Sequence, residues 1–238
     1  VDYGTEYLDL LRGFADADSK PDAPLTVAAA KYIANAMAYD DVIRVADLKT
    51  RRDRFTRIDG EMDRGDRAMA ITEFMHPRIE EVCGTLPARL GQWIEDRPKL
   101  AAWLDRRINK GRRVRTDTIL GFGMLWLVAG RKSHRRGTLR HRIEVEHRDR
   151  WLNLVRETLP KDYDLAVEIL NTRRLIKGYS DTHVRGQSKF DKVLGALPML
   201  EGREDAADWI RRLRQAALKD EKGEAMNGAL KTVASFAD

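Results

Sequence analysis

The chain has 238 residues, 42% of them hydrophobic and 34% charged, which supports a folded core and excludes wholesale disorder. Its 44 Lys and Arg exceed its 38 Asp and Glu by only six, so the balance does not demand a dedicated polyanion binder. The single cysteine, Cys83, excludes an intramolecular disulfide and a cysteine-cluster metal site. It also favours a reducing, cytoplasmic compartment. No apolar run reaches the length of about 18 residues that a membrane span needs.

Apolar residues recur at helical spacing along most of the chain. Residues 1–24 predict a leading helix followed by a linker. Thr26 is a candidate N-cap for a long helix, because no Pro or Gly interrupts residues 27–59. Residues 68–74 suggest a short extended piece. Further helices are expected within 77–108, 118–130, 138–159, 162–177, 186–197, 203–219 and 221–236.

These elements predict an all-α fold. We expect an irregular multi-helix domain with one long helix in its N-terminal half and little or no sheet, because hairpin signals are nearly absent. Residues 1–238 are interpreted as a single helical domain. Since the chain begins with Val1, we expect it to be a piece of a longer subunit.

A polar segment lies between two glycines, Gly178 and Gly186. Gly178 can adopt the left-handed conformation that ends a helix. Two interpretations stay open: a binding loop held by rigid helices, or an interhelical turn fixed by its own side chains. The candidate ligand or interface residues here are Lys177, Gly178, Tyr179, Asp181, Thr182, His183 and Arg185.

A second candidate is a charged stripe within residues 38–52. Asp40, Arg44, Asp47 and Arg51 are spaced four, three and four apart, so on a helix they form one row of alternating sign. Such a row is either a set of solvated ion pairs or a buried or interfacial network. We also include Lys49 among the candidates.

Residues 106–148 concentrate the positive charge, with 13 Lys and Arg against three carboxylates. The segment can attract phosphates, an acidic protein or nucleic acid. Nucleic acid is disfavoured because no aromatics are interleaved and no known binding motif is present. We expect the histidines His134, His141 and His147 to belong to this basic surface, and the five tryptophans to be core anchors. The candidate docking patch comprises Arg112, Arg113, Arg115, Arg135, Arg136 and Arg140.

Two segments, 38–51 and 174–186, resemble the C-terminal helical domain of indolepyruvate oxidoreductase beta-subunit proteins. Residues 112–116 and 162–166 also fit that pattern, while His183-Val184 stands where the pair is usually His-Ala. The resemblance implies a subunit of a 2-oxoacid oxidoreductase that oxidatively decarboxylates arylpyruvates such as indolepyruvate. Thiamine diphosphate and iron–sulfur clusters, carried mainly by the partner alpha subunit, supply the chemistry, with coenzyme A and ferredoxin as acceptors.

The resemblance therefore implies an accessory or assembly domain that binds the rest of its own beta subunit and the alpha subunit. No catalytic or metal-binding residue is carried over, and no cofactor is expected in this chain itself. Ferredoxin or coenzyme A can dock on the basic segment. We further hypothesise that the stripe and the polar segment converge on one cleft. The alternatives are a basic helical nucleic-acid-binding domain and a self-contained enzyme.

Overall fold

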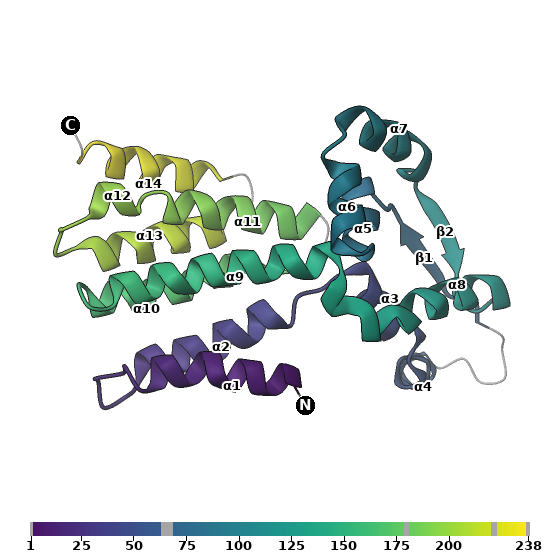
Figure 1. Ribbon diagram of the computed structural model, residues 1–238, viewed down its shortest axis with the longest axis horizontal. Helices are drawn as coiled ribbons and strands as arrows, with labels where there is room; N and C mark the ends of the chain where they lie inside the picture. The colour runs from purple at the N-terminus through teal and green to yellow at the C-terminus, as the bar shows by residue number, and fades with distance from the viewer. Residues whose placement is uncertain (1, 63–68, 179–180, 220–222, 237–238) are drawn as a thin grey trace. The chain divides into compact units, whose positions relative to one another are not determined.

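The computed structural model describes residues 2–62, 69–178, 181–219 and 223–236 (Figure 1). Helices dominate these residues, so the all-α prediction is confirmed. The chain divides into two compact units. Unit 1 comprises residues 1–39 and 145–238, and unit 2 comprises residues 40–144. The single domain over 1–238 stays a prediction.

Unit 1 is a layered set of helices around one apolar core. Trp151, Leu152 and Val155 lie on one face of α9 and are almost fully buried. The indole Nε1 of Trp151 donates to the Ile169 carbonyl at 3.0 Å, so the buried ring loses no hydrogen bond. The helices with residues in this unit are α1 (Asp2–Ala15), α2 (Pro24–Met37), α9 (Leu139–Thr158), α10 (Tyr163–Thr172), η2 (Arg173–Leu175), α11 (Asp181–Leu194), α12 (Leu197–Leu200), α13 (Ala206–Lys219) and α14 (Glu224–Ala234).

Unit 2 combines short helices with a two-stranded antiparallel ribbon. Its own small core contains Ile79, Cys83 and Leu139. Strand β1 (Thr72–Met75) lies in the region where the sequence predicts an extended piece, and it pairs with β2 (Arg112–Arg115), which was not predicted. The helices are α3 (Val42–Thr50), α4 (Arg52–Glu61), α5 (Ile79–Thr85), α6 (Ala88–Glu95), α7 (Pro98–Ile108), α8 (Ile119–Ala129) and η1 (Gly130–Gly137).

The predicted long helix over 27–59 is wrong, because the structure divides it into α2, α3 and α4. Asp41 is extended, and its side chain caps α3 by accepting from the Arg44 backbone N–H. Arg51 is extended as well, so α3 ends there. Asp at an N-cap competes with helix continuation without any Pro or Gly, which explains the error.

The second helix also begins before its predicted cap. α2 starts at Pro24, and the Thr26 side chain instead donates to Asp18 Oδ2 at 2.7 Å. Two predictions on aromatic and imidazole side chains fail too. Trp93, Trp103 and Trp126 are exposed, although Trp151 is buried as expected. His141 and His147 are buried and do not belong to an open basic surface.

Candidate functional site

The charged stripe of residues 40–51 forms ion pairs within unit 2. Arg44 Nε donates to Asp40 Oδ1 at 2.9 Å, and Arg51 pairs with Asp47 at 2.6 Å, so both predicted four-residue pairs exist. They exist although Asp40 lies before α3 and Arg51 lies after it. These pairs are partly exposed, in line with the solvated alternative.

A deeper contact involves Asp41, which was not a candidate. Its side chain is 6% exposed, and its Oδ2 accepts from Arg135 Nε at 2.6 Å. Its other oxygen accepts from the Arg44 backbone N–H at 2.7 Å. Arg135, expected in an open docking patch, is therefore held against the start of α3. The sequence signal for Asp41 was its position three residues before Arg44, the N-cap spacing.

Asp47 connects α3 to η1. Its Oδ2 accepts from Lys132 Nζ at 3.3 Å as well as from Arg51. Burial alone raises the pKa of Asp47, but the hydrogen bonds from Arg51 and Lys132 outweigh it, so the pKa lies below its ordinary value. Asp47 is thus a fixed anion that holds the basic η1 segment.

Lys49 points to a different partner. Its ammonium pairs with Glu73 on β1, and Arg54 pairs with the other oxygen of the same carboxylate. All three side chains are about four-fifths buried. The group ties α3 and α4 to the two-stranded ribbon.

The polar segment 177–186 is mostly helix, which corrects the loop prediction. Gly178 does take the predicted left-handed conformation, with φ of 72°. Helix α11 then begins at Asp181, so Thr182, His183, Arg185 and Gly186 are helical. Tyr179 lies outside the described residues, as does the side chain of Asp181.

Successive positions of α11 differ in exposure. His183 is buried at 4% exposure, whereas Thr182 and Arg185 are exposed, as is Lys177 before the helix. Gly186 is buried, and a Cβ added there would lie 2.6 Å from the Leu175 carbonyl oxygen. The second glycine therefore lets α11 approach the segment before it and does not mark a loop end.

The convergence hypothesis stays a prediction. Arg44, Asp47 and Lys49 belong to unit 2, whereas Lys177 and Arg185 belong to unit 1. Within unit 2 the three candidates have separate partners: Asp40, the pair Arg51 and Lys132, and Glu73.

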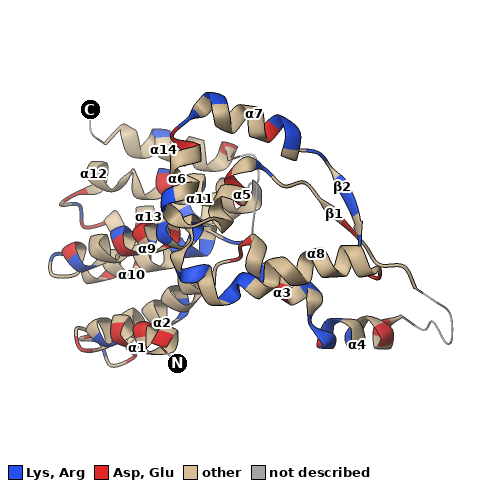
Figure 2. Ribbon diagram, turned by 45° about the vertical axis from the view of Figure 1, so that its right-hand side comes forward, with Lys and Arg blue, Asp and Glu red and all other residues tan. Residues whose placement is uncertain are grey.

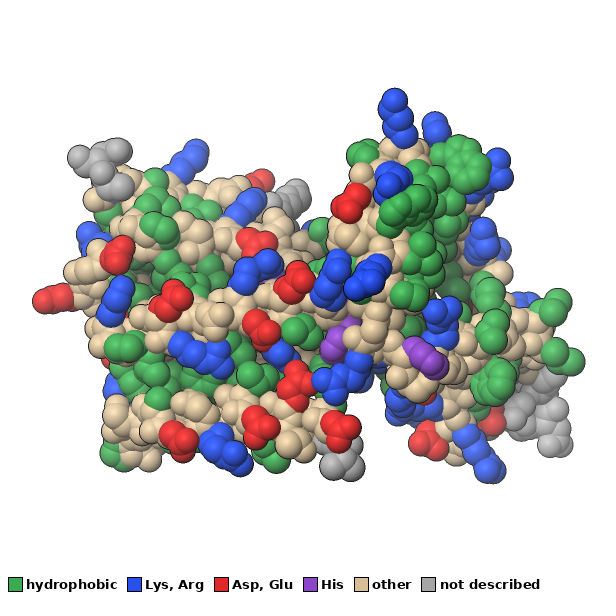
Figure 3. Space-filling view, viewed as in Figure 1, with side chains coloured by type: hydrophobic (Ala, Val, Ile, Leu, Met, Phe, Trp, Pro, Cys, Tyr) green, Lys and Arg blue, Asp and Glu red, His purple; other side chains and the backbone are tan. Residues whose placement is uncertain are grey.

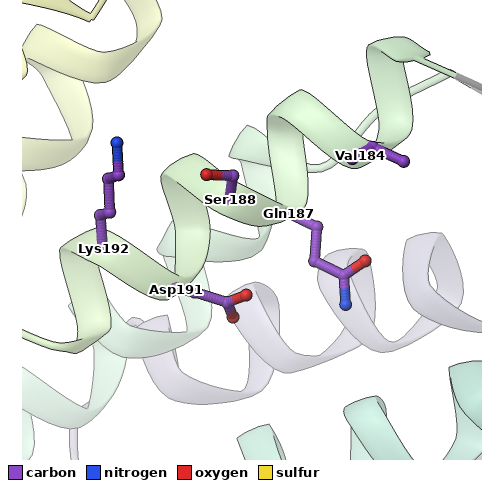
Figure 4. A pocket seen from close by; sticks show the side chains of 5 residues that line it. All are labelled: Val184, Gln187, Ser188, Asp191 and Lys192. Carbon is purple, nitrogen blue, oxygen red and sulfur yellow. The ribbon is translucent and has the colours of Figure 1, made fainter.

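The sequence did not indicate a group of contacts around His147 in unit 1. The His147 ring stacks obliquely on Phe190 at 5.1 Å and has Arg173 Nη1 3.5 Å from its Nδ1. Its Nε2 lies 3.8 Å from Asp191 Oδ1. Asp191 borders a shallow hollow of about 470 Å³ on α11 (Figure 4), where Gln187 and Asp191 point to one side of the helix, and Ser188 and Lys192 to the other.

The six arginines of the candidate docking patch fall into two groups. Arg112, Arg113 and Arg115 are exposed on β2, visible as blue ribbon in Figure 2. Arg115 pairs with Asp117, and Arg113 lies over the Phe74 ring at 5.4 Å. In the second group, Arg135 and Arg140 are largely buried against Asp41 and Glu144, and Arg136 is exposed.

These features define a mainly helical protein of two compact units, in which many charged candidates form ion pairs within one unit. The part of the chain that the structure describes contains no helix long and apolar enough to span a membrane. The chain matches, over residues 1–196, the family described as "Family of unknown function (DUF6537)", and it belongs to that family. No curated protein and no solved structure matches it.

Proposed function

We propose that this chain is an accessory and assembly domain of the beta subunit of a cytoplasmic 2-oxoacid oxidoreductase. The enzyme's substrate class is arylpyruvates such as indolepyruvate. The proposal places thiamine diphosphate, the iron–sulfur clusters and coenzyme A binding in the rest of the complex. One cysteine cannot supply the several thiolates of an iron–sulfur cluster, so this chain's donor set does not fit one.

One observation carries the accessory role. The charged side chains of the first resembling segment meet partners inside unit 2: Asp41 with Arg135, Asp47 with Lys132, and Lys49 with Glu73. A catalytic group must reach substrate. Side chains already engaged in internal pairs support a framework that presents surfaces to other subunits.

The second resembling segment supplies the candidate contact. Lys177 precedes α11, and Thr182 and Arg185 lie in its first turns; all three are exposed, whereas His183 and Gly186 are buried. Buried His183 and Gly186 hold the backbone of α11 in place. The exposed cations of Lys177 and Arg185 lie where an acidic subunit surface can reach them. Ferredoxin is the further proposed partner, and it docks on the exposed arginines of β2.

The test uses the full-length subunit that contains this sequence and its separately purified partner subunit. Calorimetry measures their association at low and moderate salt for the wild type and for the double variant Lys177→Glu/Arg185→Glu. We expect at least tenfold weaker association for the double variant and unchanged coenzyme A-dependent turnover of indolepyruvate per assembled complex. Lys161→Glu, an exposed cation elsewhere in unit 1, is the control.

Two results would contradict the proposal. Absence of arylpyruvate-dependent ferredoxin reduction in the assembled complex would exclude the oxidoreductase. Association that the double variant and the control weaken equally would exclude a specific contact at the start of α11.

The exposed arginines of β2 favour one alternative, a nucleic-acid-binding domain, because two-stranded ribbons can enter a DNA groove. Its signature is binding to random-sequence DNA that weakens steeply with salt. If the alternative holds, Arg112→Glu/Arg113→Glu abolishes that binding. Under the main proposal, the wild type itself does not bind DNA.

A further inference from the structure

Helix α8 has the sequence Ile-Leu-Gly-Phe-Gly-Met-Leu-Trp-Leu-Val-Ala, and the indole N–H of Trp126 is its only polar side-chain group. One face packs inside unit 2, where Leu125 is buried and the Phe122 ring lies 6.1 Å from Phe55 of α4. Thr118 caps its N-terminus by accepting from the Gly121 N–H at 3.2 Å. The local sequence therefore fixes a short helix with one face packed on the unit.

The opposite face of α8 is exposed and equally apolar. Surface helices normally place polar residues on that side. Leu120, Met124 and Leu127 are spaced four and three apart and form one stripe. In Figure 3 green side chains stand out at the right-hand end of the view, where Figure 1 places α8. The exposed fractions are 93% for Ile119, 87% for Leu120, 45% for Met124, 63% for Trp126 and 70% for Leu127.

The exposed stripe continues into a shallow hollow. Its volume is about 450 Å³, and it is lined by Trp126, Leu127, Gly130, Arg131 and His134. A Cβ at Gly130 would meet nothing within 4 Å, so this side of the hollow is open. The side of the hollow formed by Trp126 is apolar, and the side formed by η1 carries the cation of Arg131. An apolar side chain with a neighbouring carboxylate fits this combination.

Charge defines the partner further. Residues 112–142 contain nine Lys and Arg and one carboxylate, Asp117. Asp41, Asp47 and Asp117 meet Arg135, Lys132 and Arg115, which leaves the segment strongly positive. An acidic partner is therefore attracted and a second copy of this basic surface is repelled.

We propose that the α8 surface, meaning Ile119, Leu120, Met124, Trp126 and Leu127 with the adjoining hollow, binds an acidic amphipathic segment of a partner protein. Apolar side chains of the partner segment cover the stripe, and one of them enters the hollow. The carboxylates of the partner segment face Arg131. A lipid surface would cover the stripe, but it presents no side chain that could enter a discrete hollow of about 450 Å³ beside the stripe. The inference does not depend on the oxidoreductase proposal, because it uses only side chains of unit 2.

The test titrates the full chain against fluorescein-labelled 18-residue helical peptides by anisotropy. The acidic peptide has Leu and Phe at helical spacing with Glu elsewhere, and its matched partner has Lys in place of every Glu. We expect the acidic peptide to bind at least tenfold more tightly than the basic one. Leu127→Glu and Trp126→Ala should each weaken binding at least tenfold. Val27→Glu, an equally exposed apolar position of unit 1, is the matched control and should change nothing.

Circular dichroism and thermal unfolding check that each variant is folded. Equal affinity for both peptides, or unchanged affinity in Leu127→Glu, would overturn the proposal. Two other occupants of the α8 surface are tested in parallel. Dimerisation in sedimentation that Leu127→Glu abolishes would assign the face to a second copy. Binding to vesicles of phosphatidylserine and phosphatidylcholine that Leu127→Glu abolishes, with no peptide binding, would assign it to lipid.

Discussion

Asp41 and Arg135 are 94 positions apart, yet Arg135 Nε donates to Asp41 Oδ2 at 2.6 Å while the same carboxylate caps α3. One carboxylate thus begins a helix and holds the basic η1 segment. A charged hydrogen bond with little water around it is stronger than an exposed pair. This contact places a carboxylate against a segment that is otherwise densely positive.

Replacing Asp41 tests that double role. Asp41→Ala removes the cap, worth about 1 kcal/mol, and takes the carboxylate away from the largely buried Arg135, so we expect a total loss of about 2–4 kcal/mol in the free energy of unfolding. Asp41→Asn retains the capping oxygen and should lose about half as much. Urea unfolding measures both. Asp40→Ala, which breaks only the exposed pair with Arg44, should cost less than about 1 kcal/mol; an equal cost would refute the assignment.

Glu168 of α10 should be a second sensitive carboxylate. It is 7% exposed and accepts from Arg211 Nε at 3.2 Å and from Arg214 Nη2 at 2.7 Å, both on α13. Glu168→Gln removes the negative charge that faces the largely buried Arg214 and leaves Arg211 with only the exposed Asp208, so we expect a loss of about 3 kcal/mol. Asp208→Asn removes an exposed carboxylate from the same Arg211 and should cost less than about 0.5 kcal/mol. Urea unfolding that gives the two variants equal stability would show that the α10–α13 contact does not need this charge.

Two glycines offer a matched pair within unit 1. Gly186→Ala places a Cβ 2.6 Å from the Leu175 carbonyl, so α11 must move away and we expect a loss of about 1–3 kcal/mol. Gly228 lies in α14, and a Cβ added there would meet nothing within 4 Å, so Gly228→Ala should stabilise the protein by about 0.5–1 kcal/mol. Thermal unfolding shows whether each substitution raises or lowers the stability. A stabilising Gly186→Ala would mean that α11 does not approach Leu175 closely.

The titration of Tyr163 should lower the free energy of unfolding at high pH. Burial and the hydrogen bond that its hydroxyl donates to Asp18 raise the pKa of Tyr163 to about 12. Since the unfolded value is about 10, the proton is held more tightly in the folded state. The stabilisation is therefore complete below pH 10 and is lost as the pH rises through about 12.

The measurement is urea unfolding of the wild type and of Tyr163→Phe at intervals from pH 9 to 12. The stability difference between the two should shrink over that range, because phenylalanine does not titrate. Phenolate absorbance gives a second readout: in Asp18→Asn the titration of Tyr163 should move down toward pH 10. A difference that stays constant to pH 12 would contradict the folded-state pKa.

The sequence determined the class of fold and several local features. Helical spacing of apolar residues predicted an all-α chain, and the freedom of glycine to take positive φ predicted the conformation of Gly178. Four-residue spacing predicted the pairs Asp40–Arg44 and Asp47–Arg51. These succeed because the interacting groups lie within one or two helical turns of each other.

The remaining contacts depend on how distant segments pack together. Nothing near Asp41, Glu73 or His147 in sequence indicates Arg135, Lys49 or Arg173 as a partner, because these contacts join distant elements. Burial is likewise a property of the packed chain. Helix α8 has a sequence typical of a core helix, yet unit 2 covers only one of its faces, since its neighbours α3 and α4 pack on one side alone. Local energies choose the helices, and the surfaces left after packing decide which residues meet a partner.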